Sequence, residues 1–216
     1  MAPERNVTHG DDGRGYWERH ARGYDLSLRP LGRPLPRMLD LVRGAVAGSE
    51  RVLEVGAGTG LVTRILAGAA REVVATDYAA AMLRTLEGKV REWGLANVRC
   101  EKADLLALPF AAGSFDAVVA ANVLHLVADV PAALRAVRSV LRPGGRVIAP
   151  TFVHDQTKLS AALSRLLSLT GFPVRHRFTT EGLCVTLERG GLAVTRAETL
   201  PGLIPVAYVE GVFRPS

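Results

Sequence analysis

Acidic residues and glycines stand where an adenosine cofactor could be held. Asp77 and Asp104 each end an expected strand, and Glu54 lies inside a short apolar run that leads into the glycine turn GAGTG of residues 56–60. In doubly wound α/β folds an acid at such a strand end accepts the ribose hydroxyls of the cofactor, and glycine lets the backbone approach the ligand closely. The pattern therefore predicts a cofactor site at the carboxyl edge of a parallel sheet.

The glycine spacing separates two classes of nucleotide-binding protein. In the dinucleotide fingerprint G-x-G-x-x-G, the third glycine follows the first by five residues. Here Gly60 follows Gly56 by four residues, and Leu61 occupies the fingerprint position. The spacing disfavours a dehydrogenase-like dinucleotide enzyme, which stays as an alternative.

Histidine is the side chain best suited to move a proton near neutral pH. His125 is the first candidate for a general base, because it comes just after the fourth expected strand, on the cofactor side of the sheet. His20 and His154 are weaker candidates, and a histidine that only lines a pocket or caps a helix is the alternative for His125. Cys100 and Cys184 have neither metal-ligand nor redox spacing, so we expect no metal and a reducing cytoplasm.

Strands and helices that alternate along the chain are expected to position these residues. Apolar runs predict strands within 51–60 and at 72–77, 98–104, 114–126, 146–153, 193–200 and 203–213. Amphipathic patterns predict helices at 35–47, 61–70, 79–93, 131–141, 156–170 and 179–189, with LRPGG (141–145) as a helix stop. The alternation up to residue 153 predicts a parallel sheet, and the short link Pro201-Gly202 predicts an antiparallel hairpin at its edge.

Composition is typical of one globular domain that has no membrane-spanning segment. The chain has 216 residues, of which 48% are hydrophobic and 22% charged, and no apolar run is long enough to cross a bilayer. Residues 1–15 lack the apolar core of a signal peptide and are expected to be disordered, with a single domain at 16–216. The formal charge of +6 would allow an anionic partner, but the basic residues are scattered, as on a solvated surface.

Several segments together resemble the Rossmann-like S-adenosylmethionine-dependent methyltransferases, in the small-molecule branch that includes ubiquinone and menaquinone biosynthesis enzymes. They are VLEVGAGTG (52–60), Asp77 with Met82, KADLLALPF (102–110), SFDAVVAANVLHLV (114–127) and LRPGGRVIAP (141–150). The resemblance implies a three-layer α/β/α sandwich whose mostly parallel, seven-stranded sheet has the order 3-2-1-4-5-7-6 and an antiparallel last strand. It also implies S-adenosylmethionine as cofactor and S-adenosylhomocysteine as product.

The resemblance further implies which residues contact the cofactor. Asp77 would accept the ribose hydroxyls, Asp104 the adenine amino group, and the glycine turn would lie under the methionine part. Residues 16–48 would form N-terminal helices and a flap, and residues 154–178 a substrate cover. The residues implied to bind the cofactor are Tyr16, Tyr24, Glu54, Gly56, Ala57, Gly58, Thr59, Gly60, Asp77, Tyr78, Met82, Ala103, Asp104, Leu105, Ala121, Asn122 and Val123.

The implied activity is transfer of a methyl group to an O, N or C atom of a small molecule by in-line displacement. A lipid-like acceptor at a membrane surface, such as a quinone precursor or a phospholipid headgroup, is an alternative, and so is a non-catalytic cofactor-binding protein. Nucleic acid is disfavoured, because the segment AANVLHL (120–126) lacks the Asn/Asp-Pro-Pro-aromatic motif and neither cysteine follows a proline. We expect a monomer or a homodimer.

Overall fold

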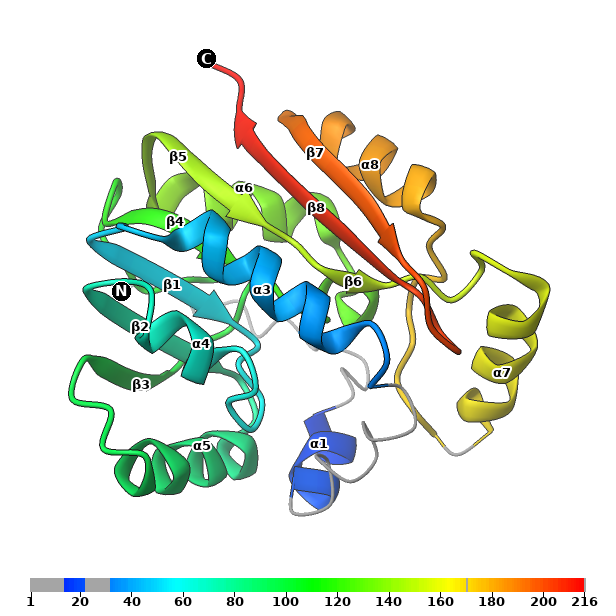
Figure 1. The fold of residues 1–216 in the computed structure, drawn as a ribbon, viewed down its shortest axis with the longest axis horizontal. Helices are drawn as coiled ribbons and strands as arrows, with labels where there is room; N and C mark the ends of the chain where they lie inside the picture. Colours follow the sequence, from blue (N-terminus) through cyan, green and yellow to red (C-terminus); the bar gives the residue numbers. More distant parts are fainter. Residues whose placement is uncertain (1–13, 22–31, 170, 216) are drawn as a thin grey trace, which may run out of the picture.

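The computed structural model describes residues 14–21, 32–169 and 171–215, which form one sheet with helices on both faces (Figure 1). The helices are α1 (Arg14–His20), α3 (Leu35–Val46), α4 (Thr63–Ala67), α5 (Ala80–Glu92), the 3-10 helix η3 (Leu124–Leu126), α6 (Val130–Val140), α7 (Lys158–Ser168) and α8 (Thr180–Arg189). The strands are β1 (Arg51–Val55), β2 (Glu72–Asp77), β3 (Val98–Lys102), β4 (Phe115–Val119), β5 (Leu141–Ile148), β6 (Thr151–Phe152), β7 (Leu192–Leu200) and β8 (Val206–Phe213). None of the helices in these ranges has the length and apolar character needed to cross a membrane.

The sheet has the predicted order. Its strands run β3-β2-β1-β4-β5-β8, with the short β6 also paired to β8 and β7 on the opposite edge of β8. β1 to β5 are parallel, whereas β8 is antiparallel to β5, β6 and β7. The predicted order 3-2-1-4-5-7-6 is confirmed, because β8 is the expected last strand and β7 the one before it. The strand order reverses between β1 and β4, and doubly wound folds bind ligands there.

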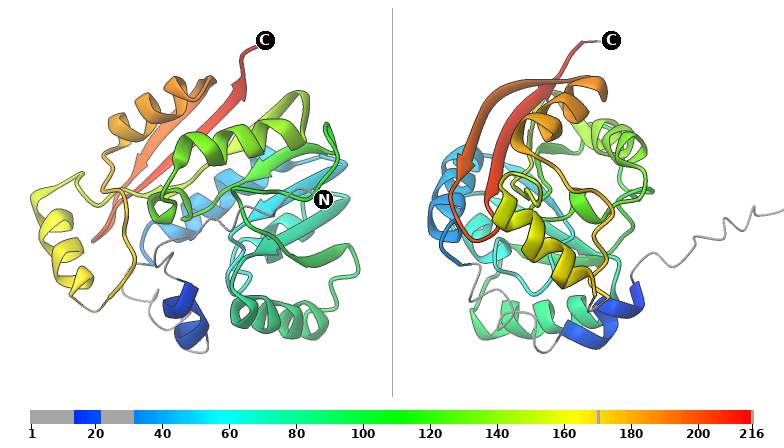
Figure 2. Two further views of the ribbon diagram at one scale, coloured as in Figure 1. Left: turned by 180° about the vertical axis from the view of Figure 1, so that it is seen from behind. Right: turned by 90° about the vertical axis from the view of Figure 1, so that its right-hand side faces the viewer.

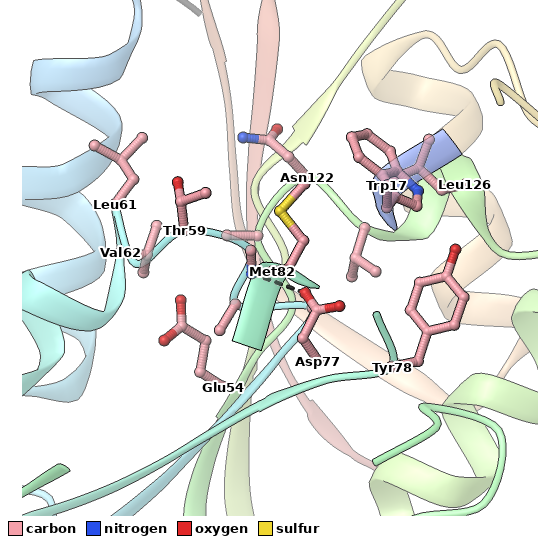
Figure 3. A pocket seen from close by; sticks show the side chains of 15 residues that line it. Trp17, Glu54, Thr59, Leu61, Val62, Asp77, Tyr78, Met82, Asn122 and Leu126 are labelled. Atoms are coloured by element: carbon pink, nitrogen blue, oxygen red, sulfur yellow. Dashed lines mark hydrogen bonds between the residues drawn. The ribbon is translucent and has the colours of Figure 1, made fainter. Parts of the chain in front are cut away.

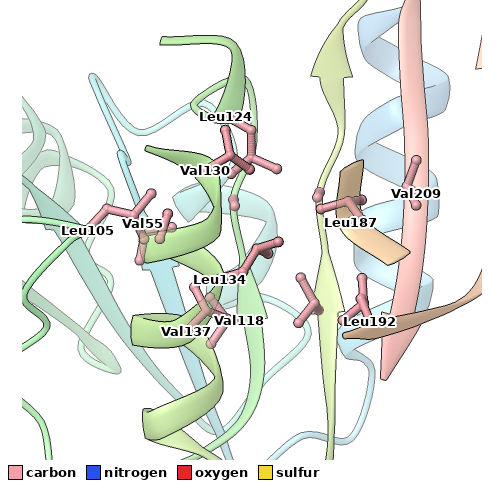
Figure 4. Close-up of a cluster of buried hydrophobic side chains, with 14 of the residues drawn as sticks. Val55, Leu105, Val118, Leu124, Val130, Leu134, Val137, Leu187, Leu192 and Val209 are labelled. Atoms are coloured by element: carbon pink, nitrogen blue, oxygen red, sulfur yellow. The ribbon is translucent and has the colours of Figure 1, made fainter. Parts of the chain in front are cut away.

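Apolar residues cover both faces of the central strands. On one face α3, α4 and α5 pack against the sheet, and on the other face α6 and α8 do so (Figure 2). Val52 faces α3, while Leu53 and Val55 face the opposite layer, which also contains Leu134 and Leu187 (Figure 4). Parallel strands buried on both sides are continuous apolar runs, because there is no solvent-exposed face to place polar residues on. Glu54 interrupts that run, which marks it as a residue with a role other than packing.

The expected fifth strand differs from the prediction at both ends. α6 ends at Val140, as the expected helix stop requires, but Leu141 already pairs with Phe115 and begins β5. The strand is then interrupted at Pro150 and resumes as β6. Proline has no N–H to donate to a neighbouring strand, which explains the interruption. The carbonyl of Pro150 instead accepts a hydrogen bond of 2.7 Å from the backbone N–H of Asn122 and so ties the end of β4 to this bend.

Two helices depart from their predicted lengths. α4 covers only Thr63–Ala67 of the expected 61–70, because it follows the glycine turn and ends at Gly68. α7 covers Lys158–Ser168 of the expected 156–170, and it projects beyond the sheet next to β6 (Figure 1). Its first turn is closed by a capping box between Thr157 and Ser160. Of the residues 1–15 expected to be disordered, 1–13 lie outside the described ranges, whereas Arg14 and Gly15 belong to α1.

Candidate active site

The glycine turn after β1 depends on conformations that favour glycine. Gly56, Gly58 and Gly60 have φ angles of 66°, 57° and 93°. A Cβ atom on Gly56 would lie 2.8 Å from a methyl carbon of Val123, and one on Gly60 would lie 2.5 Å from a methyl carbon of Leu86. Side chains are therefore excluded for two reasons, the left-handed backbone and the close approach of Val123 and Leu86. The turn brings backbone amides to the carboxyl edge of the sheet.

A pocket lies at the carboxyl ends of β1, β2 and β4, where the prediction put the cofactor (Figure 3). Among the residues that line it are many of those implied by the resemblance: Glu54, Gly56, Ala57, Gly58, Thr59, Asp77, Tyr78, Met82, Ala121, Asn122 and Val123. Trp17, Leu61, Val62 and Leu126 also line it. The elements that supply these residues are far apart in sequence and meet only because the strands are parallel and adjacent.

Asp77 joins the ends of the first two strands. One carboxylate oxygen accepts a 2.8 Å hydrogen bond from the backbone N–H of Gly58, and the other accepts one of 2.9 Å from the N–H of Ala79. Burial raises the pKa of Asp77 above its usual range, although these backbone hydrogen bonds oppose the shift. Each carboxylate oxygen can accept two hydrogen bonds. Asp77 can therefore hold the turn in place and still accept hydroxyl groups from a ligand.

Glu54 is a second buried acid in the same pocket. Its side chain is 2% exposed and accepts a hydrogen bond of 2.6 Å from the hydroxyl of Thr63 at the start of α4. Burial, followed by the charge of Asp77, raises the pKa of Glu54 to about 8, while the hydrogen bonds from Thr63 lower it. A cation bound near the two acids would favour their charged forms.

Asn122 follows the end of β4 in an uncommon conformation. Its φ of 55° is the only positive value on a non-glycine residue in the described ranges. Asparagine tolerates this conformation better than most residues do. Its side-chain oxygen is buried and has no hydrogen-bond partner within the described chain, although the residue lines the pocket. Buried polar atoms are nearly always paired, so a ligand group that donates a hydrogen bond would satisfy this one.

These groups fit a cofactor with a ribose and an amino-acid tail. A ribose diol needs acceptors, which the Asp77 carboxylate supplies at the end of β2. An ammonium group needs negative charge and further acceptors, which Glu54 and the oxygen of Asn122 supply at the ends of β1 and β4. The apolar side chains of Met82, Val123 and Leu126 also line the pocket and suit contact with a flat ring.

Six residues implied by the resemblance are not among those that line this pocket. The packing of Gly60 against Leu86 explains its glycine without a ligand. Ala103, Asp104 and Leu105 follow β3 beside Asp77, whose backbone oxygen accepts a hydrogen bond of 3.2 Å from the N–H of Ala103. Tyr16 faces a second pocket, between α1 and residues 171–175. Tyr24 lies outside the described residues.

α1 reaches the pocket through a different aromatic residue than the resemblance implies, Trp17 in place of Tyr16. Trp17 lines the pocket, and its ring packs edge-on against the rings of Tyr16 and Phe172, at 5.1 and 5.6 Å between centroids. The expected flap and the expected substrate cover therefore touch at Phe172. Tyr16 and Trp17 are neighbours in the sequence, and the sequence alone does not show which of the two rings points into the pocket.

His125 lies behind the pocket wall. Its neighbours Val123 and Leu126 line the pocket, whereas the imidazole is 1% exposed and packs against Phe152 and Phe172. Burial, together with the nearby histidines, lowers the pKa of His125 well below its usual value, so the ring is neutral at pH 7. His20 is exposed and stacks on Tyr16, 4.0 Å between ring centroids, away from the pocket-lining residues.

The comparisons with known proteins agree with this geometry. Residues 53–149 match the methyltransferase domain family. A ubiquinone/menaquinone biosynthesis C-methyltransferase of Teredinibacter turnerae is 34% identical over 174 residues, which cover 77% of this chain and 70% of that protein. The chain belongs to the S-adenosylmethionine-dependent methyltransferases. The predicted family and its cofactor, S-adenosylmethionine, are thereby confirmed.

One further relative and one solved structure support the same family and fold, and neither identifies the acceptor of this chain. A demethylmenaquinone methyltransferase of Beutenbergia cavernae is 39% identical over 143 residues, which cover 64% of this methyltransferase chain but only 57% of that protein. A solved S-adenosylmethionine-dependent methyltransferase of Aquifex aeolicus has a TM-score of 0.70 at 18% identity, covering 93% of this chain and 98% of that one. That likeness confirms the Rossmann-like fold, while the acceptor has to be argued from the site.

Replacing Asp77 by Asn tests its role toward the ribose. We expect Asp77→Asn to weaken S-adenosylhomocysteine binding at least tenfold, because a charged acceptor of two hydroxyls is lost and hydrogen bonds to charged groups contribute about 1.5–3 kcal/mol each. Isothermal titration calorimetry measures the change, and circular dichroism checks that the fold is kept. Asp40→Asn, on the exposed side of α3, is the matched control and should bind as the wild type does. Equal affinities in both variants would contradict the ribose role.

Glu54 should make stability depend on pH. Its pKa of about 8 in the folded protein is higher than the 4.5 of a free glutamate. At pH values between these two, the folded state therefore binds more protons than the unfolded state does. Stability then falls as pH rises through this window. We expect Glu54→Gln to gain melting temperature relative to the wild type across the window, by a few degrees, since each unit of pKa shift corresponds to about 1.4 kcal/mol.

The control for this pH series is Glu92→Gln, at an exposed position on α5. It should follow the wild type at every pH. Some pH dependence will remain in Glu54→Gln, because the pKa of Asp77 is also raised. A constant difference between Glu54→Gln and the wild type would show that Glu54 does not titrate in the window.

Proposed function

We propose that this protein transfers the methyl group of S-adenosylmethionine to an O, N or C atom of a small, largely apolar acceptor. The observation that carries the proposal is the convergence of Asp77, Glu54 and Asn122 in one pocket beside the glycine turn. Family membership supports the reaction class. The apolar character of the wall on the side of Trp17 and Leu126 supports an apolar acceptor.

The chain's contribution to such a reaction is mainly positioning. The bound cofactor supplies a methyl group on a positively charged sulfur, which is already a good leaving group. Asp77 and the glycine turn orient the adenosine and amino-acid ends of the cofactor. The apolar side chains that line the pocket exclude water from the space between cofactor and acceptor. Holding two reactants in line can contribute about 7–11 kcal/mol in favourable cases. An obligatory catalytic side chain is therefore not needed.

His125 is the proposed general base for acceptors that lose a proton. Its imidazole is neutral, and its Nδ1 atom has no hydrogen-bond partner among the described residues. Nδ1 can therefore accept a hydrogen bond from the acceptor, and the proton moves to the ring only where the charge of the reacting groups offsets the burial that lowers the pKa of His125. A base of this kind contributes about 10²–10⁴-fold, and only if the attacking atom carries a proton. Acceptors without such a proton would not need His125.

A lipid-like acceptor met at a membrane surface is the second proposal, and α7 supports it. Leu159, Leu166 and Leu169 are 63%, 62% and 83% exposed. With the exposed Ala162 between the first two, successive members of this set lie three or four residues apart. They form one apolar stripe on the outer side of the helix. Lys158 and Arg165, both exposed, flank the stripe. An apolar stripe with basic flanks suits an anionic lipid surface.

A thermal-shift panel tests the cofactor and separates it from the dinucleotide alternative. A ligand at 100 times its dissociation constant stabilises the folded state by about 2.7 kcal/mol, which corresponds to several degrees in a chain of this size. We expect S-adenosylmethionine and S-adenosylhomocysteine to raise the melting temperature, and NAD and NADP to leave it unchanged. A shift with a nicotinamide ligand alone would contradict the proposal. Methyl transfer to an acceptor panel then separates an enzyme from a non-catalytic binder.

Vesicle sedimentation tests the membrane proposal. We expect the protein to sediment with phosphatidylglycerol vesicles more than with phosphatidylcholine vesicles, because the stripe supplies apolar area and its flanks supply positive charge. The double variant Leu166→Asp/Leu169→Asp should lose most of this binding. Val185→Asp, a half-exposed apolar position on α8, is the control and should bind as the wild type does. Equal binding by the double variant and the control would contradict the role of α7.

A further inference from the structure

A second histidine lies beside His125 in the same buried cluster. His154 follows β6, is 2% exposed, and its ring lies 5.2 Å from that of His125, tilted by 49°. Neither ring nitrogen of His154 has a hydrogen-bond partner in the described part of the chain, and nor has Nδ1 of His125. Buried polar atoms are paired in the great majority of cases. Three unpaired ring nitrogens on two adjacent side chains therefore point to a binding role.

The cluster is next to the cofactor pocket. Asn122 and Leu126 line the pocket and lie within four residues of His125 on the same segment. From the other side, Trp17 lines the pocket and contacts Phe172, whose ring stacks over His125 at 6.5 Å. The two histidines thus lie behind the pocket-lining residues Trp17 and Leu126, with Phe172 packed between Trp17 and His125.

The hydrogen-bonding capacity of the pair matches a hydroxyl group. Burial and the nearby Arg177 lower the pKa of His154 to about 4, so its ring is neutral at pH 7 and carries one donor and one acceptor. His125 is neutral because burial, followed by the nearby His154 and His176, lowers its pKa. The side-chain oxygen of Asn122, which has no partner among the described residues, is an acceptor only. A hydroxyl both donates and accepts, whereas a carboxylate or phosphate only accepts. The ring of Phe152 makes the remaining surroundings apolar.

A structural role in packing explains these residues less well. His176, the third histidine of the cluster, has Nε2 within 2.9 Å of the carbonyl oxygen of Val127, and its backbone N–H is bonded to the carbonyl of His125. Its position is therefore held by hydrogen bonds, in contrast to the rings of His125 and His154. A metal is not indicated either, because within the described residues no three His, Cys, Asp or Glu side chains are grouped to hold one.

We propose that His125 and His154 form the acceptor-recognition site, and that they hold a neutral hydroxyl group carried by an apolar acceptor. This rests on the proposed methyltransferase function and specifies its substrate class. One imidazole accepts the hydroxyl proton in a hydrogen bond while the other donates to the hydroxyl oxygen. His154 acts as a positioning and specificity residue, and it distinguishes hydroxylated acceptors from anionic or wholly apolar ones of the same size.

Three single-ring probes of similar size test this recognition: phenol, toluene and benzoate. Their dissociation constants are measured by ligand-observed NMR titration, with and without S-adenosylhomocysteine. We expect the wild type to bind phenol more tightly than benzoate, and the ratio of phenol to toluene affinity to fall at least fivefold in His154→Phe. A site built to hydrogen-bond a hydroxyl discriminates strongly against analogues that lack it, because its own polar groups are then left unpaired.

Two further variants separate recognition from packing. His154→Gln keeps a donor and an acceptor and should retain most of the preference for phenol over toluene. His20→Phe changes an exposed histidine on α1 and should leave that ratio unchanged. An unchanged ratio in His154→Phe, or a wild type that binds benzoate as well as phenol, would overturn the proposal. If S-adenosylhomocysteine does not bind, the function proposed above fails, and the ratio measured without it still decides the role of His154.

Discussion

The hydrogen bond from the Gly58 amide to the Asp77 carboxylate is the interaction on which the site depends. It joins the turn after β1 to the end of β2, and it requires a left-handed backbone at the glycines and a buried acid opposite them. A carboxylate is costly to bury without donors, and the two backbone amides supply them. The turn and the acid therefore stabilise each other. The remaining groups of the pocket are placed relative to this pair.

Burial of polar groups in and near the pocket lowers the stability of the fold, and the packing of the apolar sheet has to offset this loss. Glu54 lies among the apolar residues Val52, Leu53 and Val55 of β1. Within the described residues, the oxygen of Asn122 and the rings of His125 and His154 are buried without full hydrogen-bond pairing. Folded proteins keep few such groups, and those that remain concentrate where ligands bind. The packed layers around Leu53, Val118 and Leu134 supply the stability that allows them.

Two regions of the molecule, one buried and one exposed, support the proposals on the chemistry of the acceptor. Inside, the histidine pair and its aromatic neighbours lie beyond the cofactor pocket and offer hydrogen bonds in an apolar setting. Outside, the leucine stripe of α7 is exposed although the inward side of that helix carries the buried Ser160 and Ser164. Leu163 and Leu167 pack against the sheet from this inward side, and Arg177 donates hydrogen bonds to Ser164 and Ser168. A hydroxylated, partly apolar acceptor is consistent with both regions.

The sequence by itself determined the glycine turn, the acid at the end of β2 and the parallel sheet with its antiparallel edge hairpin, because these follow from local patterns: apolar runs, residues that allow positive φ, and the alternation of strands and helices. The strand order followed only from the resemblance of the motifs to a known family. The sequence did not determine the interruption at Pro150, the inward direction of Trp17, or the pairing of His125 with His154. His154 is 29 residues from His125 in the sequence, so no spacing rule relates them. Only the tertiary structure decides such contacts, because they arise where neighbouring strand ends and a returning loop pack together in space.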